Sequence, residues 1–293
     1  MHITTSISSH KVALTALILF AAANSLACGD DNDGANGATP TPAAVSTMPE
    51  GEPVSGDITV FAAASLTDAF NEIAEGFTTA NPDADVEFNF AGSPALVTQL
   101  IEGAPGDVLA TADQRNMDAA LEEGAVVDAG TAFARNRLVI IVPSDNPGEV
   151  ETPADLAIPG LRLVLALPEV PVGNYARQAL AKFDGADGYP ADFSATVLEH
   201  LVSEEPNVKS VVTKVQLGEA DAGIVYVTDV TDDVAADIST IEITDAYNVI
   251  ATYPIAVTSS ADSPDVAQAF IDYVLSDEGQ SVLATYGFIP VDD

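Results

Sequence analysis

Hydrophobic positions follow two different periods along this chain, and the first change of period begins at Ile58. The segment Ile58–Phe61 is apolar and partly β-branched, which predicts a buried strand. From Leu66 onward the apolar positions recur at helical spacing, which predicts a helix over Thr67–Thr78. Ser65 falls at the strand-to-helix turn, at or just before the helix N-cap, where serine is favoured. Such a turn can bind an anion through free backbone N–H groups, although helix capping alone would also explain Ser65.

The same pattern occurs a second time. Apolar and polar residues alternate over 85–90 (DVEFNF), as in a half-buried strand, and Ala91-Gly92 form the turn. We predict Ser93 at the next helix N-cap and Pro94 at N1, where proline is well tolerated. Two neighbouring strands would therefore each end in a serine-capped helix. Capping does not require this duplication, whereas an anion site does.

The rest of the chain keeps alternating between strands and helices. Strand patterns cover 106–111, 137–143, 161–167, 223–227, 241–243 and 253–257. Helical patterns cover 112–124, 152–156, the segment after the turn 168–175, 197–202, 208–215 and one long C-terminal helix closed at 287. This alternation predicts an α/β fold with mostly parallel sheets, and the length of 293 residues suits two lobes.

Net charge limits the possible partners. The chain carries 9 Lys and Arg against 45 Asp and Glu, a net charge of −36, which repels nucleic acid and anionic lipid. Surface charge is damped beyond about 8 Å at physiological salt. A site lined by N–H and O–H donors can therefore still bind an anion.

The first 28 residues have the pattern of a secretory signal. A short apolar segment, 12–22, follows His10 and Lys11, and it is too short to span a membrane. Cys28 is the only cysteine, and its position resembles the lipobox of bacterial lipoproteins, with Leu26 one place nearer the cysteine than usual. We interpret Cys28 as a lipidation site; an ordinary signal peptide cut near Ala27 is the alternative. Residues 29–56 are rich in Gly, Pro and Asp and have no apolar period, which predicts a disordered tether.

Other chemistries receive little support. A serine hydrolase acting through Ser65 or Ser93 would need a base, and His200 is the only histidine beyond the signal segment. His200 is predicted on a helix with Leu201 and Val202, and neither serine lies in a Gly-x-Ser-x-Gly elbow. Divalent-metal capture usually needs several histidines with carboxylates. Four arginines are interpreted as solvated or ion-paired: Arg135, Arg137, Arg162 and Arg177.

Five segments together resemble one family. They are FAAASLTDAF, FAGSPALVTQLIEGAPGDVLATADQRNMD, ALPEVPVGNYARQAL, GEADAGIVYVTD and YPIAV, and they run from about Ile58 to the C-terminus. They resemble the extracytoplasmic molybdate-binding proteins of ABC transporters. The resemblance implies a two-lobed type II periplasmic-binding-protein fold with the ligand in the interlobe cleft. One lobe would contain 57–136 and 253–293, and the other 137–252.

The resemblance also implies the ligand contacts. In this family hydroxyls and backbone N–H groups hold a tetrahedral oxyanion, and the matching positions are Ser65, Ser93, Val172, Val208 and Tyr226. Gly92-Ser93-Pro94 stands where the family commonly has a run of serines, and Val172 replaces a smaller residue. Without the resemblance, Tyr226 would be interpreted as an ordinary core tyrosine.

The resulting hypothesis is a binding protein that captures molybdate, and also tungstate, outside the cytoplasmic membrane and delivers it to an ABC permease. It would be a lipid-anchored monomer with no catalytic activity, cofactor or free metal ion. The alternatives are a secreted serine hydrolase and a binding protein for another oxyanion such as sulfate.

Overall fold

The structure is a computed structural model, and it describes residues 53–291. The predicted signal segment, Cys28 and most of the predicted tether lie outside this range. The first two residues of strand β1 (Ser55–Ala63) fall within the predicted tether, which ends at 56. Within 53–291, no helix combines the length and the hydrophobicity that crossing a membrane requires.

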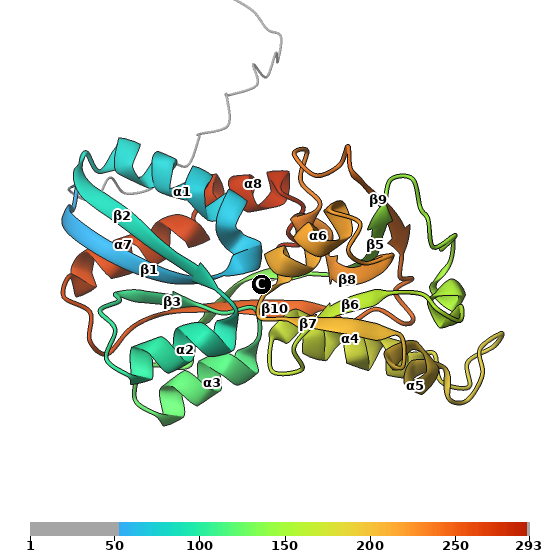
Figure 1. The fold of residues 1–293 in the computed structure, drawn as a ribbon. Helices are drawn as coiled ribbons and strands as arrows, with labels where there is room; N and C mark the ends of the chain where they lie inside the picture. The colour runs from blue at the N-terminus through green and yellow to red at the C-terminus, as the bar shows by residue number, and fades with distance from the viewer. Residues whose placement is uncertain (1–52, 292–293) are drawn as a thin grey trace, which may run out of the picture. The chain divides into compact units, whose positions relative to one another are not determined.

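The described chain forms two five-stranded sheets flanked by helices (Figure 1). The first has the order β2-β1-β3-β10-β4 and the second the order β7-β6-β8-β5-β9. Besides β1, the first sheet contains β2 (Asp83–Ala91), β3 (Val108–Ala110), β4 (Thr131–Asn136) and β10 (Ala251–Val257). The second contains β5 (Leu138–Pro143), β6 (Leu163–Ala166), β7 (Leu201–Glu205), β8 (Ala222–Tyr226) and β9 (Ile238–Glu242).

Helices pack on both sheets: α1, α2 and α7 contact the first, and α4 and α6 contact the second. The α-helices are α1 (Thr67–Ala80), α2 (Ser93–Ile101), α3 (Gln114–Glu122), α4 (Pro171–Lys182), α5 (Phe193–Leu198), α6 (Val208–Gln216), α7 (Pro264–Leu275) and α8 (Asp277–Thr285). Short 3₁₀ helices are η1 (Ala64–Leu66), η2 (Pro153–Ala157) and η3 (Val227–Asp229).

The sheets are mixed rather than mostly parallel, which corrects one expectation. In each sheet three neighbouring strands are parallel: β2, β1 and β3 in the first, and β7, β6 and β8 in the second. The other pairings are antiparallel. The chain passes directly from β4 to β5, and so from one sheet to the other, at Arg137. The strands that carry the chain between the sheets are thus antiparallel to their neighbours.

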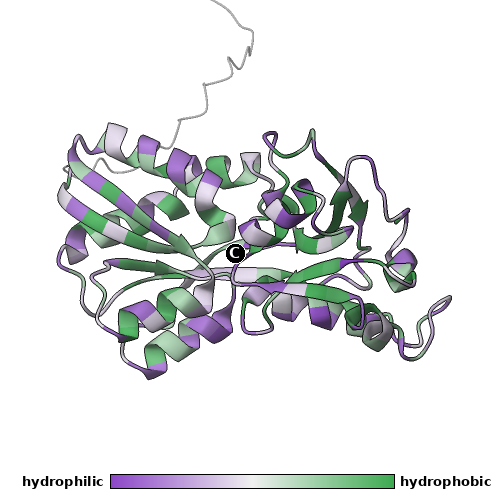
Figure 2. Cartoon of the chain, in the orientation of Figure 1, coloured by the Kyte–Doolittle hydropathy of each residue, from purple (hydrophilic) through white to green (hydrophobic). Residues whose placement is uncertain are grey.

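Apolar burial explains why these segments form these elements. Every residue of β5, β6 and β8 is buried, in keeping with the continuous apolar pattern of those segments. Figure 2 shows hydrophobic positions concentrated along these strands, while the helices carry both hydrophobic and hydrophilic residues. Beside the first sheet, the ring of Phe270 on α7 packs edge-to-face against the rings of both Phe70 and Phe77 on α1, which holds the two helices together.

Two expected elements differ in the structure, and one strand was missed. The predicted helix over 197–202 is wrong in its second half, because α5 ends at Leu198 and Leu201 begins strand β7. His200 therefore lies between a helix and a strand, where its ring nitrogen Nδ1 is 3.1 Å from the carbonyl of Leu156. Strand β4 was not predicted. The long C-terminal helix is two helices, since Ser276 ends α7 and its hydroxyl caps α8.

Candidate functional site

A small pocket lies where the carboxyl ends of the parallel strands of both sheets meet. All five residues suggested by the sequence line it: Ser65, Ser93, Val172, Val208 and Tyr226. No charged side chain lines it. About 220 Å³ of it is unfilled by atoms. We call it the central pocket.

Ser65 reaches the central pocket from the end of β1. It lies in η1, one residue before Leu66, the N-cap of α1, and its side chain caps no helix, so the interpretation as a cap is wrong. Its hydroxyl oxygen instead lies 2.9 Å from the hydroxyl oxygen of Tyr253, on β10. Ser65 is 5% exposed, so a ligand in the pocket would contact a hydroxyl that is almost completely shielded from water.

Ser93 reaches the pocket from the neighbouring strand. Gly92 is the N-cap of α2, so Ser93 is its first residue and Pro94 its second, one place later than predicted. The hydroxyl oxygen of Ser93 accepts a hydrogen bond from the backbone N–H of Ala112 at 3.1 Å. Its own hydrogen is therefore available to a ligand. Because β1 and β2 are parallel and pair from Ser55 to Ala63, both serines emerge at the same sheet edge.

Val172 and Val208 contribute helix N-termini from the second sheet. Val172 is the second residue of α4, which follows β6, and Val208 is the first residue of α6, which follows β7. The first N–H groups of a helix have no acceptor within it and lie at the positive end of the helix dipole. Asn207 precedes α6 and caps it by accepting from Ser210 N–H at 3.0 Å. Both helices therefore present backbone donors to the pocket.

Tyr226, the last residue of β8, provides the most informative feature of the site. Its hydroxyl is completely buried and has no hydrogen-bond partner among the described residues. Burial raises the pKa of Tyr226 well above its ordinary value, so the hydroxyl keeps its hydrogen. A buried donor without a partner costs free energy, and in a native protein it calls for an explanation. A ligand in the central pocket would supply its acceptor.

Two polar contacts join the sides of the pocket. Lys209, on α6, pairs with Asp68, on α1, at 2.6 Å. Arg115, on α3, donates to the carbonyl oxygen of Glu169, just before α4, at 2.6 Å. Both are partly exposed, so each adds little stability. They show that the two sides of the pocket are in contact in this structure.

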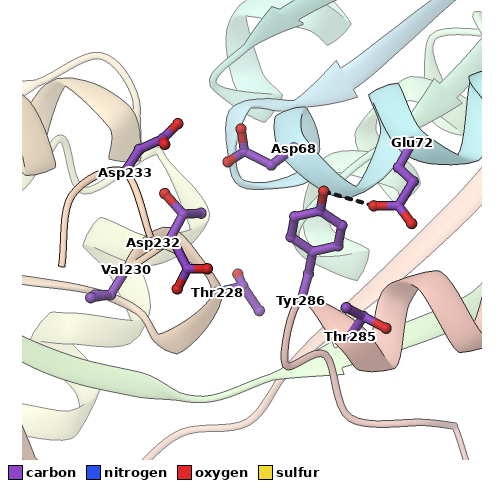
Figure 3. Close-up of a pocket in the computed structure, with 9 residues that line it drawn as sticks. Asp68, Glu72, Thr228, Val230, Asp232, Asp233, Thr285 and Tyr286 are labelled. Atoms are coloured by element: carbon purple, nitrogen blue, oxygen red, sulfur yellow. Dashed lines mark hydrogen bonds between the residues drawn. The ribbon is translucent and has the colours of Figure 1, made fainter.

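A second, wider pocket is unsuited to an anion (Figure 3). About 850 Å³ of it is unfilled by atoms, and its lining contains Asp68, Glu72, Asp232 and Asp233. The hydroxyl of Tyr286 donates to Glu72 at 2.9 Å. Within 53–291, neither this pocket nor any other place holds a group of three or more His, Cys, Asp or Glu arranged to bind a metal ion.

The interpretation of the arginines as solvated or ion-paired is confirmed for three residues. Arg137, Arg162 and Arg177 pair with Asp245, Asp221 and Glu204, respectively. None of these arginines lines the central pocket.

Next to the site, Asp229 is a completely buried carboxyl group. One oxygen accepts the N–H of Tyr226 at 3.1 Å, and the other has no partner among the described residues. Burial raises the pKa of Asp229 to about 7 from 3.8, although the positive charge of Lys209 partly opposes this. The folded protein therefore holds this proton more tightly than the unfolded chain. The stabilising effect is complete below about pH 4 and is lost as the pH rises through about 7.

We predict that Asp229→Asn removes this pH dependence. Relative to the variant, the wild type should lose unfolding free energy between about pH 4 and 7, by at most about 1.4 kcal/mol per pH unit. Urea unfolding at a series of pH values measures the difference. Asp233→Asn, an exposed carboxyl of the same loop, is the control and should track the wild type. Parallel curves for wild type and Asp229→Asn would show that Asp229 does not titrate in this window.

Comparison with known proteins places the chain in a family. The model of the family described as bacterial extracellular solute-binding protein matches residues 58–289. The chain belongs to this family. Its members bind a solute outside the cell, which agrees with the predicted class of transport protein and its extracytoplasmic location.

Individual relatives are consistent with this family. The molybdate-binding protein ModA of Mycobacterium tuberculosis is 38% identical over 265 residues, covering 90% of this chain and 92% of the relative. The periplasmic molybdate-binding protein of Azotobacter vinelandii superposes with a TM-score of 0.68 at 22% identity, covering 80% of this chain and 100% of that one. The sulfate-binding protein SubI of M. tuberculosis H37Rv superposes with a TM-score of 0.72 at 19% identity, covering 80% of this chain and 87% of that one. The two structures confirm the two-lobed type II periplasmic-binding-protein fold.

Proposed function

We propose that this protein captures molybdate, and also tungstate, outside the cytoplasmic membrane and delivers it to an ABC permease. The observation that carries the proposal is the uncharged central pocket, which combines buried hydroxyls with two helix N-termini and leaves the Tyr226 hydroxyl without a partner. The similarity to the M. tuberculosis molybdate-binding protein supports this choice of ligand. Molybdate is the transported ligand here, and no cofactor takes part.

Hydrogen-bond chemistry favours a fully ionised oxyanion in such a pocket. Molybdate accepts hydrogen bonds through all four oxygens and donates none, so it matches a lining that provides donors. Hydrogenphosphate carries a proton that would need an acceptor, and leaving that proton unpaired in a buried site is costly. Tungstate has nearly the same size and charge as molybdate, so the same donors serve both.

The proposal is tested by calorimetric titration with molybdate, tungstate, sulfate and phosphate. We expect reversible, saturable binding of molybdate and tungstate and no turnover. Ser65→Ala and Ser93→Ala should each weaken molybdate binding by ~1.5–3 kcal/mol, the value of a hydrogen bond to a charged group. Tighter binding of sulfate than of molybdate would contradict the proposed ligand. Full molybdate affinity in both serine variants would place the anion elsewhere.

Tyr226→Phe should separate affinity from stability. Loss of the hydroxyl removes one donor and should weaken molybdate binding by ~1.5–3 kcal/mol. It also removes a buried donor without a partner, so the ligand-free variant should be as stable as the wild type or more stable by ~1 kcal/mol. Urea unfolding without ligand, together with calorimetry, measures both. A large loss of stability would mean that the hydroxyl is satisfied within the protein.

We propose a division into two lobes that lies close to the boundary between the two sheets, with β10 beginning at Ala251, two residues before the proposed crossover. One lobe comprises 57–136 with 253–293, and the other comprises 137–252. Ser65 and Ser93 then belong to the first lobe, and the other three ligand residues to the second. We infer that the lobes separate to admit the ligand and close around it, because the proposed donors come from both lobes and an anion can reach all of them only when the lobes are closed.

Catalysis by the two serines finds no support in their surroundings. Ser65 contacts Tyr253 and Ser93 contacts Ala112, whereas His200, the only histidine among residues 53–291, lies between α5 and β7 with its Nδ1 beside the carbonyl of Leu156 in η2. Neither serine therefore has the base that a hydrolase nucleophile needs. We accordingly propose a binding protein without enzymatic activity.

The proposed anchor is a lipid on Cys28, with residues 29 onward as a tether to the folded domain and the protein acting as a monomer. A permease at the membrane then receives the ligand from a protein held close to it. Loss of membrane association in Cys28→Ala would support the anchor, and its retention would contradict it.

A further inference from the structure

Tyr253 and Asn136 lie directly behind the central pocket, and neither lines it. Both side chains are completely buried. The hydroxyl oxygen of Tyr253 is 2.9 Å from that of Ser65 and 3.4 Å from Nδ2 of Asn136. Asn136 ends β4, next to the point where the chain passes to the second sheet. These contacts form a short line of hydrogen bonds that ends at a proposed ligand residue.

The orientation of the Asn136 amide gives this line its direction. Oδ1 accepts the backbone N–H of Arg137 at 2.9 Å, so it cannot be exchanged with Nδ2 without losing that bond. Nδ2 donates to the hydroxyl of Thr228 at 2.8 Å and faces Tyr253. An amide nitrogen can only donate. The hydroxyl oxygen of Tyr253 therefore accepts from Asn136.

The single hydrogen of Tyr253 then has Ser65 as its acceptor. Burial raises the pKa of Tyr253 far above its ordinary value, so this hydrogen is present at all physiological pH values. The Tyr226 hydroxyl also lies beside that of Tyr253 but makes no hydrogen bond of ordinary geometry, so Ser65, at 2.9 Å, is the remaining acceptor within hydrogen-bond range. When the oxygen of Ser65 accepts this hydrogen, its own hydrogen is left to point toward the ligand.

We propose that Tyr253, oriented by Asn136, is a positioning residue that fixes Ser65 as a donor and so makes the site prefer fully deprotonated oxyanions. This inference rests on the proposed function. A serine hydroxyl that can rotate freely either donates to an anion or accepts the proton of a protonated one. With one of the two lone pairs of its oxygen taken by Tyr253, Ser65 favours donation, and a protonated anion meets a poorer acceptor there than a freely rotating hydroxyl would offer.

Ser93 differs from Ser65 in how its orientation is fixed. The donor to Ser93 is the backbone N–H of Ala112, which no side-chain substitution removes. Of the two serines, only Ser65 depends on a side chain that can be changed. Tyr253→Phe thus alters the orientation of one hydroxyl and leaves the lining of the pocket intact.

The test compares selenate with arsenate on the wild type and Tyr253→Phe at mildly alkaline pH. The two anions are similar in size and both carry two charges, but hydrogenarsenate has one more proton. Their affinities are measured by displacement of molybdate in a calorimeter. We expect the preference for selenate over arsenate to fall about tenfold in Tyr253→Phe, the effect of one hydrogen bond of ordinary strength. Tyr273→Phe, on α7 and outside the pocket, is the control and should leave the preference unchanged.

Each other outcome is decisive. Equal weakening of selenate and arsenate in Tyr253→Phe would indicate a merely structural role and overturn the inference, as would an unchanged preference. In a Ser65→Ala background Tyr253→Phe should no longer change the preference, and a persisting change would also overturn it. If Tyr253→Phe does not fold, Asn136→Ala should shift the preference in the same direction, and failure to do so overturns the inference. A wild type that binds none of these anions would overturn the proposed function itself.

Discussion

Gly173→Ala is expected to lower the free energy of unfolding by about 3 kcal/mol or more, a large effect for adding one methyl group. A Cβ at this position would lie 2.2 Å from the carbonyl oxygen of Leu167 and 2.3 Å from that of Ala166. Both obstacles are backbone atoms at the end of β6, so no side chain can turn away. The helix α4 would have to move off the sheet, and the N–H of Val172 would leave the pocket with it.

Urea unfolding followed by circular dichroism measures this loss, and calorimetry with molybdate measures the accompanying loss of affinity. Gly188→Ala is a suitable control, because no atom lies near its Cβ position but its φ is +86°. It should cost about 1 kcal/mol through backbone strain alone. A loss in Gly173→Ala no greater than in Gly188→Ala would mean that α4 tolerates the methyl group.

Most elements around the site were visible in the sequence. The two strand–turn–helix units at Ser65 and Ser93 were predictable because the change from apolar strand to helical period is local. Their convergence at one edge follows from the parallel pairing of β1 and β2. The family resemblance supplied Val172, Val208 and Tyr226, whose roles composition and periodicity do not reveal.

The partners of the two serines could not be predicted from local pattern. Ser65 contacts a residue 188 positions away and Ser93 one that is 19 away. Helix boundaries are uncertain by one or two residues, which was enough to place Ser93 at the N-cap instead of Gly92. Tyr253 lies within a segment that carried the resemblance, yet only the structure shows that it reaches Ser65.

Strand β7 was missed for a different reason. It is a short edge strand in which half-buried and exposed residues alternate, and it follows α5 after two residues. Leu201 and Val202 then continue the helical spacing of Val197 and Leu198 closely enough to be assigned to the same helix. Pairing with β6, which lies far away in sequence, decides the outcome. Tertiary contacts here override the local pattern.

The second large effect is expected for Gly92→Ala, which should block closure of the pocket without unfolding the protein. A Cβ on Gly92 would lie 2.3 Å from the backbone carbonyl oxygen of Pro206. Gly92 precedes α2 on the first side of the pocket, and Pro206 follows β7 on the second. The backbone of Gly92 has φ −64° and ψ 138°, which alanine adopts without strain. The methyl group therefore clashes only across the pocket.

With closure blocked, an anion held by Ser65 and Ser93 would lose the three donors of the second side. At about 1.5 kcal/mol each, Gly92→Ala should raise the Kd for molybdate by roughly a thousandfold. Its unfolding free energy without ligand should stay within about 1 kcal/mol of the wild type, since the sides can separate. Small-angle scattering should show that molybdate reduces the radius of gyration of the wild type and leaves that of the variant unchanged.

Gly76→Ala is the matched control. Its Cβ would meet the hydroxyl of Tyr273, far from the pocket lining, so Gly76→Ala should lose stability and not affinity. Wild-type affinity in Gly92→Ala would show that the anion is bound without contact between the two sides.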